Sequence, residues 1–150
     1  MSEWSEATWA DVTGCAAALG RDAFVASTTA TGEPHLAIVW LVVVGDVFHF
    51  VGDRGSVKVR NLAARPAVAA HWQVPDSGAC ARCQLYLRGS ASLVDEPAER
   101  RRLWDSGAWG DLGQWYGGPD DASMAFVRID TTYASLTEDA GSGPRRRWRA

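Results

Sequence analysis

Residues 50–62 contain the side chains with the clearest potential for chemistry. A glycine-containing loop, Gly52-Asp53-Arg54-Gly55, runs here into a stretch whose apolar residues suit a short helix. Backbone N–H groups at a helix start, joined by a hydroxyl and by cationic side chains, favour a bound anion such as phosphate. A solvated helix start would show the same spacing, so spacing alone leaves both interpretations open. The candidate anion ligands are Ser56, Lys58, Arg60 and Asn61.

Lys58 stands out by composition as well as by position. The chain has 15 lysine and arginine residues, and Lys58 is the only lysine among them. A compact ammonium and a planar guanidinium are not interchangeable at a specific contact. Lysine at this one position therefore suggests a role that arginine does not fill.

Other residue types with chemical potential give weaker patterns. Cys80 and Cys83 have the two-residue spacing of redox and zinc motifs, but one pair supplies only half of a tetrahedral site. His35 and His49 have no metal-like spacing, and His71 fits either a cofactor cleft or a buried hydrogen-bonded position. We therefore predict no metal site.

The chain shows no Ser-His-Asp order and no paired carboxylates, so no catalytic residue is predicted from the sequence. Redox cofactors carry their own chemistry, and the protein then supplies binding and electrostatics. The absence of acid–base machinery therefore favours a bound redox cofactor over hydrolytic chemistry.

The elements that must position these residues are mainly strands with flanking helices. Hairpin connections and few crossovers favour an antiparallel barrel over a parallel α/β sheet. Residues 1–137 are expected to form one domain and residues 138–150 a mobile basic tail. Helices are predicted over residues 8–19, 56–64 and 98–105, and strands over residues 23–28, 35–44, 47–51, 67–72, 84–94, 124–130 and 132–136.

The strand predicted over residues 35–44 is almost unbroken in its apolar character. A strand that is apolar on both faces must be covered on both, and a domain of this size cannot do so alone. We therefore expect a homodimer in which a second copy covers one face.

Composition excludes several classes of partner. The formal net charge of −3 gives no electrostatic basis for nucleic-acid binding. No apolar run approaches the ~20 residues that a membrane span needs, and the acidic N-terminus does not resemble a secretion signal. An odd number of cysteines agrees with a reducing compartment, so we expect a cytoplasmic protein.

Taken in order, these motifs resemble the pyridoxamine 5'-phosphate oxidase-like superfamily over nearly the whole chain. The pattern Ser56-x-Lys58-x-x-x-Leu62-x-x-x-Pro66-x-Val68-Ala69 resembles the phosphate-binding segment of that superfamily, although the true oxidases carry arginine in the place of Val57. Residues 115–121, Trp-Tyr-Gly-Gly-Pro-Asp-Asp, resemble its general stress protein branch. Residues 58–62 resemble the branch with deazaflavin-dependent reductases.

The resemblance implies a six-stranded antiparallel split β-barrel that forms a homodimer, with two FMN molecules in clefts between the subunits. It also implies that Ser56 and Lys58 hold the FMN phosphate and that the ring is flanked by Val39, Trp40, Leu41, Phe50 and Val51. For Trp40, core or dimer packing is the favoured interpretation over contact with the ring. The implied function is an oxidoreductase that passes hydride or electrons to a small planar acceptor.

Two alternatives share this fold. One is a reductase that uses deazaflavin in place of FMN, and the other is a flavin- or haem-binding sensor or carrier without turnover. Visible absorption distinguishes the three cofactors.

Overall fold

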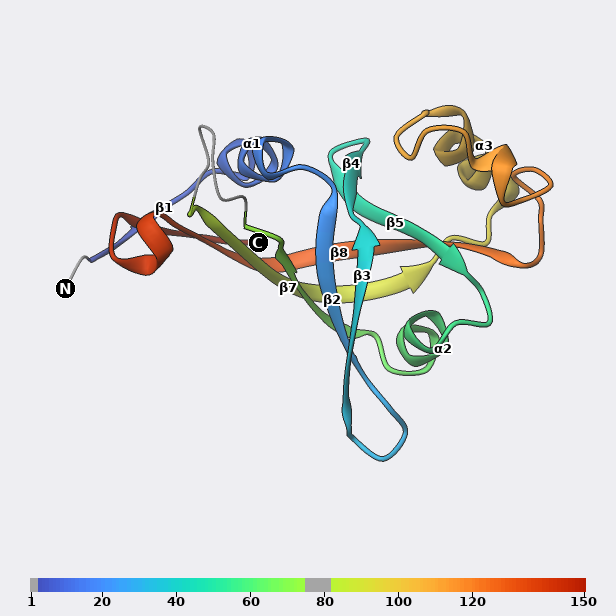
Figure 1. The fold of residues 1–150 in the computed structure, drawn as a ribbon, viewed down its shortest axis with the longest axis horizontal. Coiled ribbons are helices and arrows are strands. Elements are labelled where there is room, and N and C mark those ends of the chain that lie inside the picture. Colours follow the sequence, from blue (N-terminus) through green and yellow to red (C-terminus); the bar gives the residue numbers. More distant parts are fainter. Residues whose placement is uncertain (1–2, 75–81) are drawn as a thin grey trace.

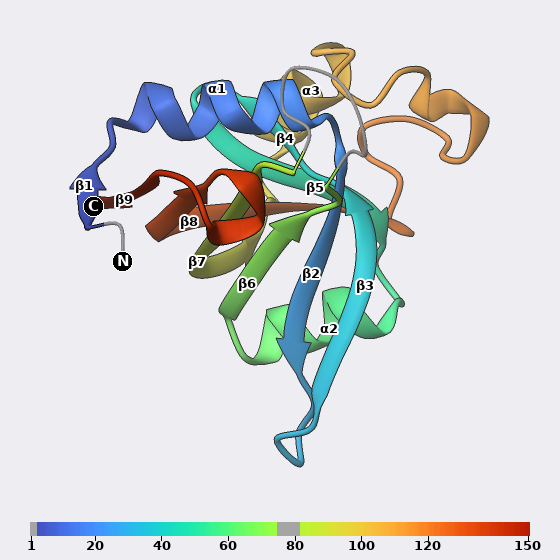
Figure 2. The same cartoon turned by 60° about the vertical axis from the view of Figure 1, so that its left-hand side comes forward.

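The computed structural model describes residues 3–74 and 82–150, which fold into a mainly β structure with three α-helices (Figures 1 and 2). All described strands belong to one mixed nine-stranded sheet. The helices are α1 (Trp9–Leu19), α2 (Val57–Ala64) and α3 (Pro97–Asp105), with 3-10 turns at Leu112–Gln114 and Asp139–Gly141. The strands are β1 (Trp4–Glu6), β2 (Asp22–Thr28), β3 (Pro34–Trp40), β4 (Val42–Val44), β5 (Val47–Asp53), β6 (Ala67–Trp72), β7 (Gln84–Leu93), β8 (Met124–Thr137) and β9 (Arg145–Arg149).

The long strand β8 organises the sheet. One edge of β8 pairs with β7 along most of its length, and the sheet continues through β6 and β2 to β3. The other edge pairs with β5 in its first half and with β9 in its second half. The antiparallel pattern expected from the sequence is present, but the sheet is open, contains nine strands, and includes one parallel pair between β1 and β9.

The apolar stretch predicted as one strand over residues 35–44 is two strands. β3 pairs with β2 as far as Trp40, whereas β4 pairs with β5. Leu41 lies between them, with its side chain 1% exposed and its backbone N–H donated to the Arg21 carbonyl at 2.9 Å. The chain thus changes partner strand at Leu41, which an unbroken apolar run does not reveal.

The expectation of a mobile tail after residue 137 was wrong for its last part. β9 (Arg145–Arg149) pairs with both β8 and β1, and Trp148 packs on Trp9 with ring centroids 4.6 Å apart. Arg146 lies 3.4 Å from an Asp11 carboxylate oxygen. Arg145 donates to the Gly141 carbonyl from Nε at 3.1 Å and from Nη2 at 2.7 Å. Backbone pairing on both edges and these side-chain contacts therefore hold β9 in the sheet.

The three helices cover different parts of the sheet. α1 begins with a capping box, in which Thr8 and Asp11 exchange hydrogen bonds. α1 and α2 both contribute to the larger core cluster, through residues such as Val12 and Leu62. A second cluster, around Leu103 of α3, packs against β4, β5 and the start of β8. Figure 1 shows α3 at one end of the sheet, beside the segment that returns to β8.

None of the helices within residues 3–74 and 82–150 combines the length and the apolar character that a membrane span requires.

Candidate functional site

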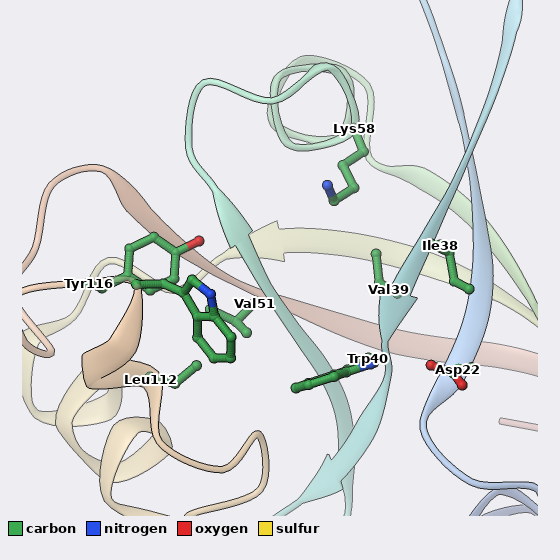
Figure 3. A pocket seen from close by; sticks show the side chains of 9 residues that line it. Asp22, Ile38, Val39, Trp40, Val51, Lys58, Leu112 and Tyr116 are labelled. Carbon is green, nitrogen blue, oxygen red and sulfur yellow. The ribbon is translucent and has the colours of Figure 1, made fainter.

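A pocket of about 410 Å³ opens between β3, β5, α2 and the segment 107–121 that follows α3 (Figure 3). Its volume lies in the range of roughly 300–1,000 Å³ that is usual for small-molecule sites. The lining is mostly apolar and aromatic with one ammonium and one carboxylate, and it consists of Asp22, Ile38, Val39, Trp40, Val51, Lys58, Leu112, Trp115 and Tyr116.

Lys58 supplies the positive charge of the pocket. It is the second residue of α2, and Figure 3 shows its side chain directed into the pocket. Gly52 leaves space for it, because a Cβ at that position would lie 3.3 Å from Lys58 Cε. Within the described residues, no ion pair or hydrogen bond engages the Lys58 ammonium. A half-buried ammonium without a protein partner is suited to an anionic ligand.

The strand wall of the pocket comes from β3 and β5. Trp40 is 38% exposed, and the Arg21 guanidinium lies 4.1 Å from its ring centroid, a cation–π contact. Ile38, Val39 and Val51 add flat aliphatic surface beside this ring. Such a wall favours a planar ligand over a flexible polar one.

The loop wall comes from residues 107–121, which the sequence analysis did not place at the site. Trp115 meets Trp40 edge-to-face, with ring centroids 6.4 Å apart and an interplanar angle of 80°. The Tyr116 hydroxyl donates a hydrogen bond to Asp53 Oδ1 at 2.7 Å. Burial and the adjacent Asp53 carboxylate raise the pKa of Tyr116 well above its usual value, so its hydroxyl stays protonated. Leu112, which is 5% exposed, closes the base of this wall.

Four of the nine residues predicted to contact a cofactor line this pocket. These are Val39, Trp40, Val51 and Lys58. They come from three different elements, β3, β5 and α2, and the fold brings them together around one space.

The other five predicted residues have different surroundings. Leu41 and Phe50 are buried in the larger core cluster. The Ser56 hydroxyl donates to the Asp53 carbonyl at 2.7 Å and does not cap α2, and Arg60 is exposed. Asn61 is 6% exposed and donates through Nδ2 to Ser27 Oγ at 3.1 Å, a structural bond between α2 and β2. Of the four anion ligands expected from spacing, Ser56, Lys58, Arg60 and Asn61, only Lys58 lines the pocket.

Asp22, at the start of β2, lines the pocket but was not among the predicted cofactor contacts. Three lining residues of the loop wall were not predicted either, namely Leu112, Trp115 and Tyr116. These three residues lie in a glycine-rich loop, where the sequence has no helical or strand periodicity from which their position could be predicted. The available signal was the adjacent pair of aromatic residues in the stretch that resembles the general stress protein branch.

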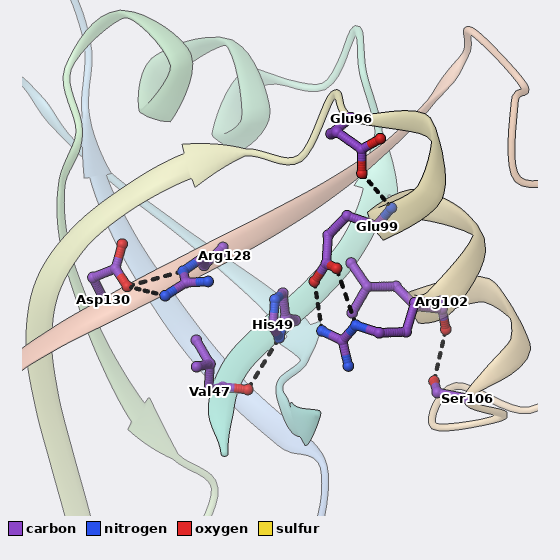
Figure 4. A network of polar contacts seen from close by, with 9 residues as sticks. Val47, His49, Glu96, Glu99, Arg102, Ser106, Arg128 and Asp130 are labelled. Carbon is purple, nitrogen blue, oxygen red and sulfur yellow. Dashed lines mark hydrogen bonds and ion pairs between the residues drawn. The ribbon is translucent and has the colours of Figure 1, made fainter. Parts of the chain in front are cut away.

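His49 belongs to a separate polar network on the α3 side of the sheet (Figure 4). Its side chain is 1% exposed, Nδ1 contacts the Val47 carbonyl at 3.0 Å, and Nε2 has no hydrogen-bond partner among the described residues. Burial lowers the pKa of His49, and the contact with the Val47 carbonyl opposes this shift. Arg128 and Arg102 also lower the pKa, whereas Glu99 raises it. None of these residues lines the pocket.

Cys83, the described member of the cysteine pair, is not part of the pocket lining. Cys80 is outside the described residues, whereas Cys83 precedes β7 and lines a separate hollow together with Cys15 of α1.

Comparison with known proteins identifies the family. The sequence profile of the pyridoxamine 5'-phosphate oxidase family matches residues 20–138, which is most of the chain. A search of curated proteins finds no match.

Solved structures share the fold at low sequence identity. General stress protein 26 from Bacillus anthracis aligns with a TM-score of 0.65 and 16% identity, over 85% of this chain and 92% of that one. A pyridoxamine 5'-phosphate oxidase-related, FMN-binding protein from Nostoc punctiforme aligns with a TM-score of 0.63 and 17% identity, over 93% and 84%. A haem-binding protein from Mycobacterium smegmatis aligns with a TM-score of 0.75 and 15% identity, over 96% of this chain and 59% of that one.

The matched residues include both the strands that form the pocket and the lysine that charges it, and on this evidence the chain belongs to the pyridoxamine 5'-phosphate oxidase family.

Proposed function

We propose that this protein binds FMN in the pocket around Lys58 and acts as an oxidoreductase toward a small planar acceptor. The observation that carries the proposal is the half-buried residue Lys58, whose ammonium has no ion pair or hydrogen bond within the described residues and is directed into a pocket with flat apolar and aromatic walls. FMN combines a phosphate with a planar ring, and this pocket offers one feature for each.

The residues present fit the two parts of the cofactor. Lys58 would contact the phosphate, and the first-turn N–H groups of α2, which the Ser56 side chain does not cap, would support it. Val39, Trp40 and Val51 would lie against the ring. Bound FMN would supply hydride or electron transfer, while these side chains hold the ring and exclude water from it.

We also propose that the protein is a homodimer, with the six longest strands (β2, β3 and β5–β8) forming the split barrel of the family. Large apolar side chains remain exposed on β2 and β3, where Phe24 is 37% exposed, Leu36 is 64% exposed and Ile38 is 53% exposed. Ile38 also lines the pocket, so this apolar face is continuous with the cofactor site. A second copy on this face would cover the apolar side chains and close the open side of the pocket.

A haem-binding structure shares the fold, but the pocket favours flavin over haem. Its lining, as far as the described residues go, contains no histidine, methionine or cysteine to serve as an axial ligand. Tyrosine can also bind haem iron, but the Tyr116 hydroxyl donates to Asp53 and its pKa is raised, which disfavours the phenolate that would bind iron. Deazaflavin shares the planar ring and an anionic group with FMN, so the same pocket could accept either cofactor.

Titration of the purified protein with FMN, deazaflavin cofactor and haemin, followed by tryptophan fluorescence and visible absorption, tests the cofactor assignment. We expect saturable binding of FMN at one equivalent per chain. Tighter binding of the deazaflavin would reassign the cofactor, and exclusive binding of haemin would overturn the proposal.

Light scattering tests the assembly. We expect twice the chain mass for the wild type and a monomer for Leu36→Glu, with Trp4→Glu as a control because Trp4 is 39% exposed on β1, at the opposite end of the strand order from β3. A wild-type monomer that still binds FMN would contradict the two-subunit site.

A further inference from the structure

The segment 107–121 is fixed to the two strands that form the opposite wall of the pocket. The Trp109 indole N–H donates to the Trp40 carbonyl at 2.9 Å, and the Tyr116 hydroxyl donates to Asp53 Oδ1 at 2.7 Å. Trp109 itself is 1% exposed, so its end of the segment is anchored in the core. These two bonds join the segment to the end of β3 and to the end of β5.

The far end of the segment is held by a buried arginine. Arg100 of α3 is 6% exposed, and its guanidinium donates to the carbonyls of Pro119 at 2.8 Å, Asp121 at 2.9 Å and Met124 at 3.1 Å. The Asp121 carboxylate accepts hydrogen bonds from the Gly117 backbone N–H at 2.7 Å and from Ser123. Hydrogen bonds therefore hold the loop that carries Trp115 both before and after that residue.

Trp115 contrasts with its anchored neighbours. It is 59% exposed, although it lies between buried Leu112 and the bonded Tyr116, and it faces the pocket opposite Trp40. A large aromatic ring held at the mouth of a pocket, with most of its surface uncovered, offers that surface to a planar ligand.

We propose that Trp115 is a ring-binding residue that forms, with the Trp40 ring at 80° to it, two adjoining walls of an aromatic slot at the pocket mouth. The Tyr116–Asp53 hydrogen bond is the latch that holds Trp115 there. The identity of the planar group, a flavin ring, rests on the proposed function. Tyr116 is a positioning residue: its hydroxyl is committed to Asp53, and it acts through the neighbouring Trp115. In this proposal Trp115 contacts the ring of the ligand, whereas Lys58 contacts its anionic group.

Titration with FMN and with riboflavin, which lacks the phosphate, tests the slot. Trp115→Ala should weaken both ligands by the same factor, roughly 2- to 12-fold, because an aromatic contact to the ring is common to both. Trp115→Phe should recover most of the affinity. Bound-flavin fluorescence should be higher in both variants than in the wild type, because the indole is no longer beside the ring to quench it.

Tyr116→Phe tests the latch with the aromatic ring kept in place. We expect roughly threefold weaker binding of both ligands and higher bound-flavin fluorescence than in the wild type. Faster hydrogen exchange in residues 107–121 of the ligand-free protein should accompany these changes. Asp53→Asn, which retains an acceptor oxygen, should lie between wild type and Tyr116→Phe in all three measurements.

The outcomes separate this inference from the proposed function. Unchanged affinity of Trp115→Ala for both flavins, with FMN still bound by the wild type, would overturn the slot and leave the flavin assignment standing. An effect of Trp115→Ala on FMN but not on riboflavin would also overturn it. Failure of the wild type to bind either flavin would overturn the cofactor assignment and the slot together, whereas unchanged hydrogen exchange in Tyr116→Phe would overturn the latch alone.

Discussion

On one side of the pocket Lys58 projects from α2 without a protein partner among the described residues, whereas on the other side Trp115 and Tyr116 lie in a segment fixed by many hydrogen bonds. The α2 side is built from local sequence, a glycine-containing loop followed by a short helix. The loop side depends on contacts between distant parts of the chain, because Tyr116 and Asp53 are 63 residues apart. A local sequence motif can thus supply the charged side chain of a binding site, whereas the walls that shape the site depend on contacts between distant parts of the chain.

Loss of Arg100 should have the largest effect, because it removes the support of the loop side. Arg100→Met leaves the carbonyls of Pro119, Asp121 and Met124 without their donor, and we expect a loss of about 3 kcal/mol in the free energy of unfolding. Urea denaturation measures this loss. Arg101→Met is the matched control, since the Arg101 side chain is 63% exposed with a 3.9 Å ion pair, and it should change stability by less than about 0.5 kcal/mol. Equal effects of the two substitutions would show that the segment is not held by Arg100.

The second-largest expected effect is the loss of folding stability at acidic pH that comes from His49, on the α3 side of the sheet. Burial lowers the pKa of His49 below its ordinary value of 6.5, so the unfolded chain binds a proton more readily than the folded one. The stabilisation from neutral His49 is complete above pH 6.5 and is lost as the pH falls below it. His49→Leu should therefore show a flatter stability profile between pH 7 and pH 5, measured by urea denaturation at each pH.

His71→Leu, which keeps His49, is the control for this profile and should retain the contribution of His49 to the slope. A wild-type slope in His49→Leu would refute the assignment of the acid sensitivity to His49.

Lys58→Ala should have the smallest effect on stability. Because the ammonium has no protein partner in the described chain, we expect a change of less than about 0.5 kcal/mol in the free energy of unfolding of the ligand-free protein. Thermal denaturation without ligand measures it. A loss comparable to that of Arg100→Met would mean that Lys58 supports the fold, and the contrast between the two sides would disappear.

Local signals in the sequence predicted much of the framework. The three helices and most strands follow from spacing and turn residues, and each is confirmed within a few residues. The change of partner strand at Leu41 and the pairing of β9 could not be predicted, because an apolar run and an arginine run carry no record of their partners.

The site was predicted in part for the same reason. Lys58 was accessible to sequence reasoning because its motif is local and its residue type is unique in the chain. Asn61 fits the same motif, but its amide is used in a bond to Ser27, 34 residues away. Trp115 lies in a loop that is bonded to Arg100 and Asp53, both outside the segment 107–121. Local sequence patterns do not predict the site residues whose side chains are positioned by long-range hydrogen bonds.

The most direct test of the account is the ratio of FMN to riboflavin affinity in wild type and Lys58→Ala. If the ammonium contacts the cofactor phosphate, the substitution removes a charge-assisted hydrogen bond worth roughly 1.5–3 kcal/mol, and FMN affinity should fall by about one to two decades. Riboflavin affinity should stay the same, and added salt should weaken FMN binding to the wild type more than to the variant. Arg60→Ala, which removes an exposed charge two residues along the same helix, should have a much smaller effect. An unchanged FMN to riboflavin ratio in Lys58→Ala would contradict the central claim that Lys58 binds the anionic group of the cofactor.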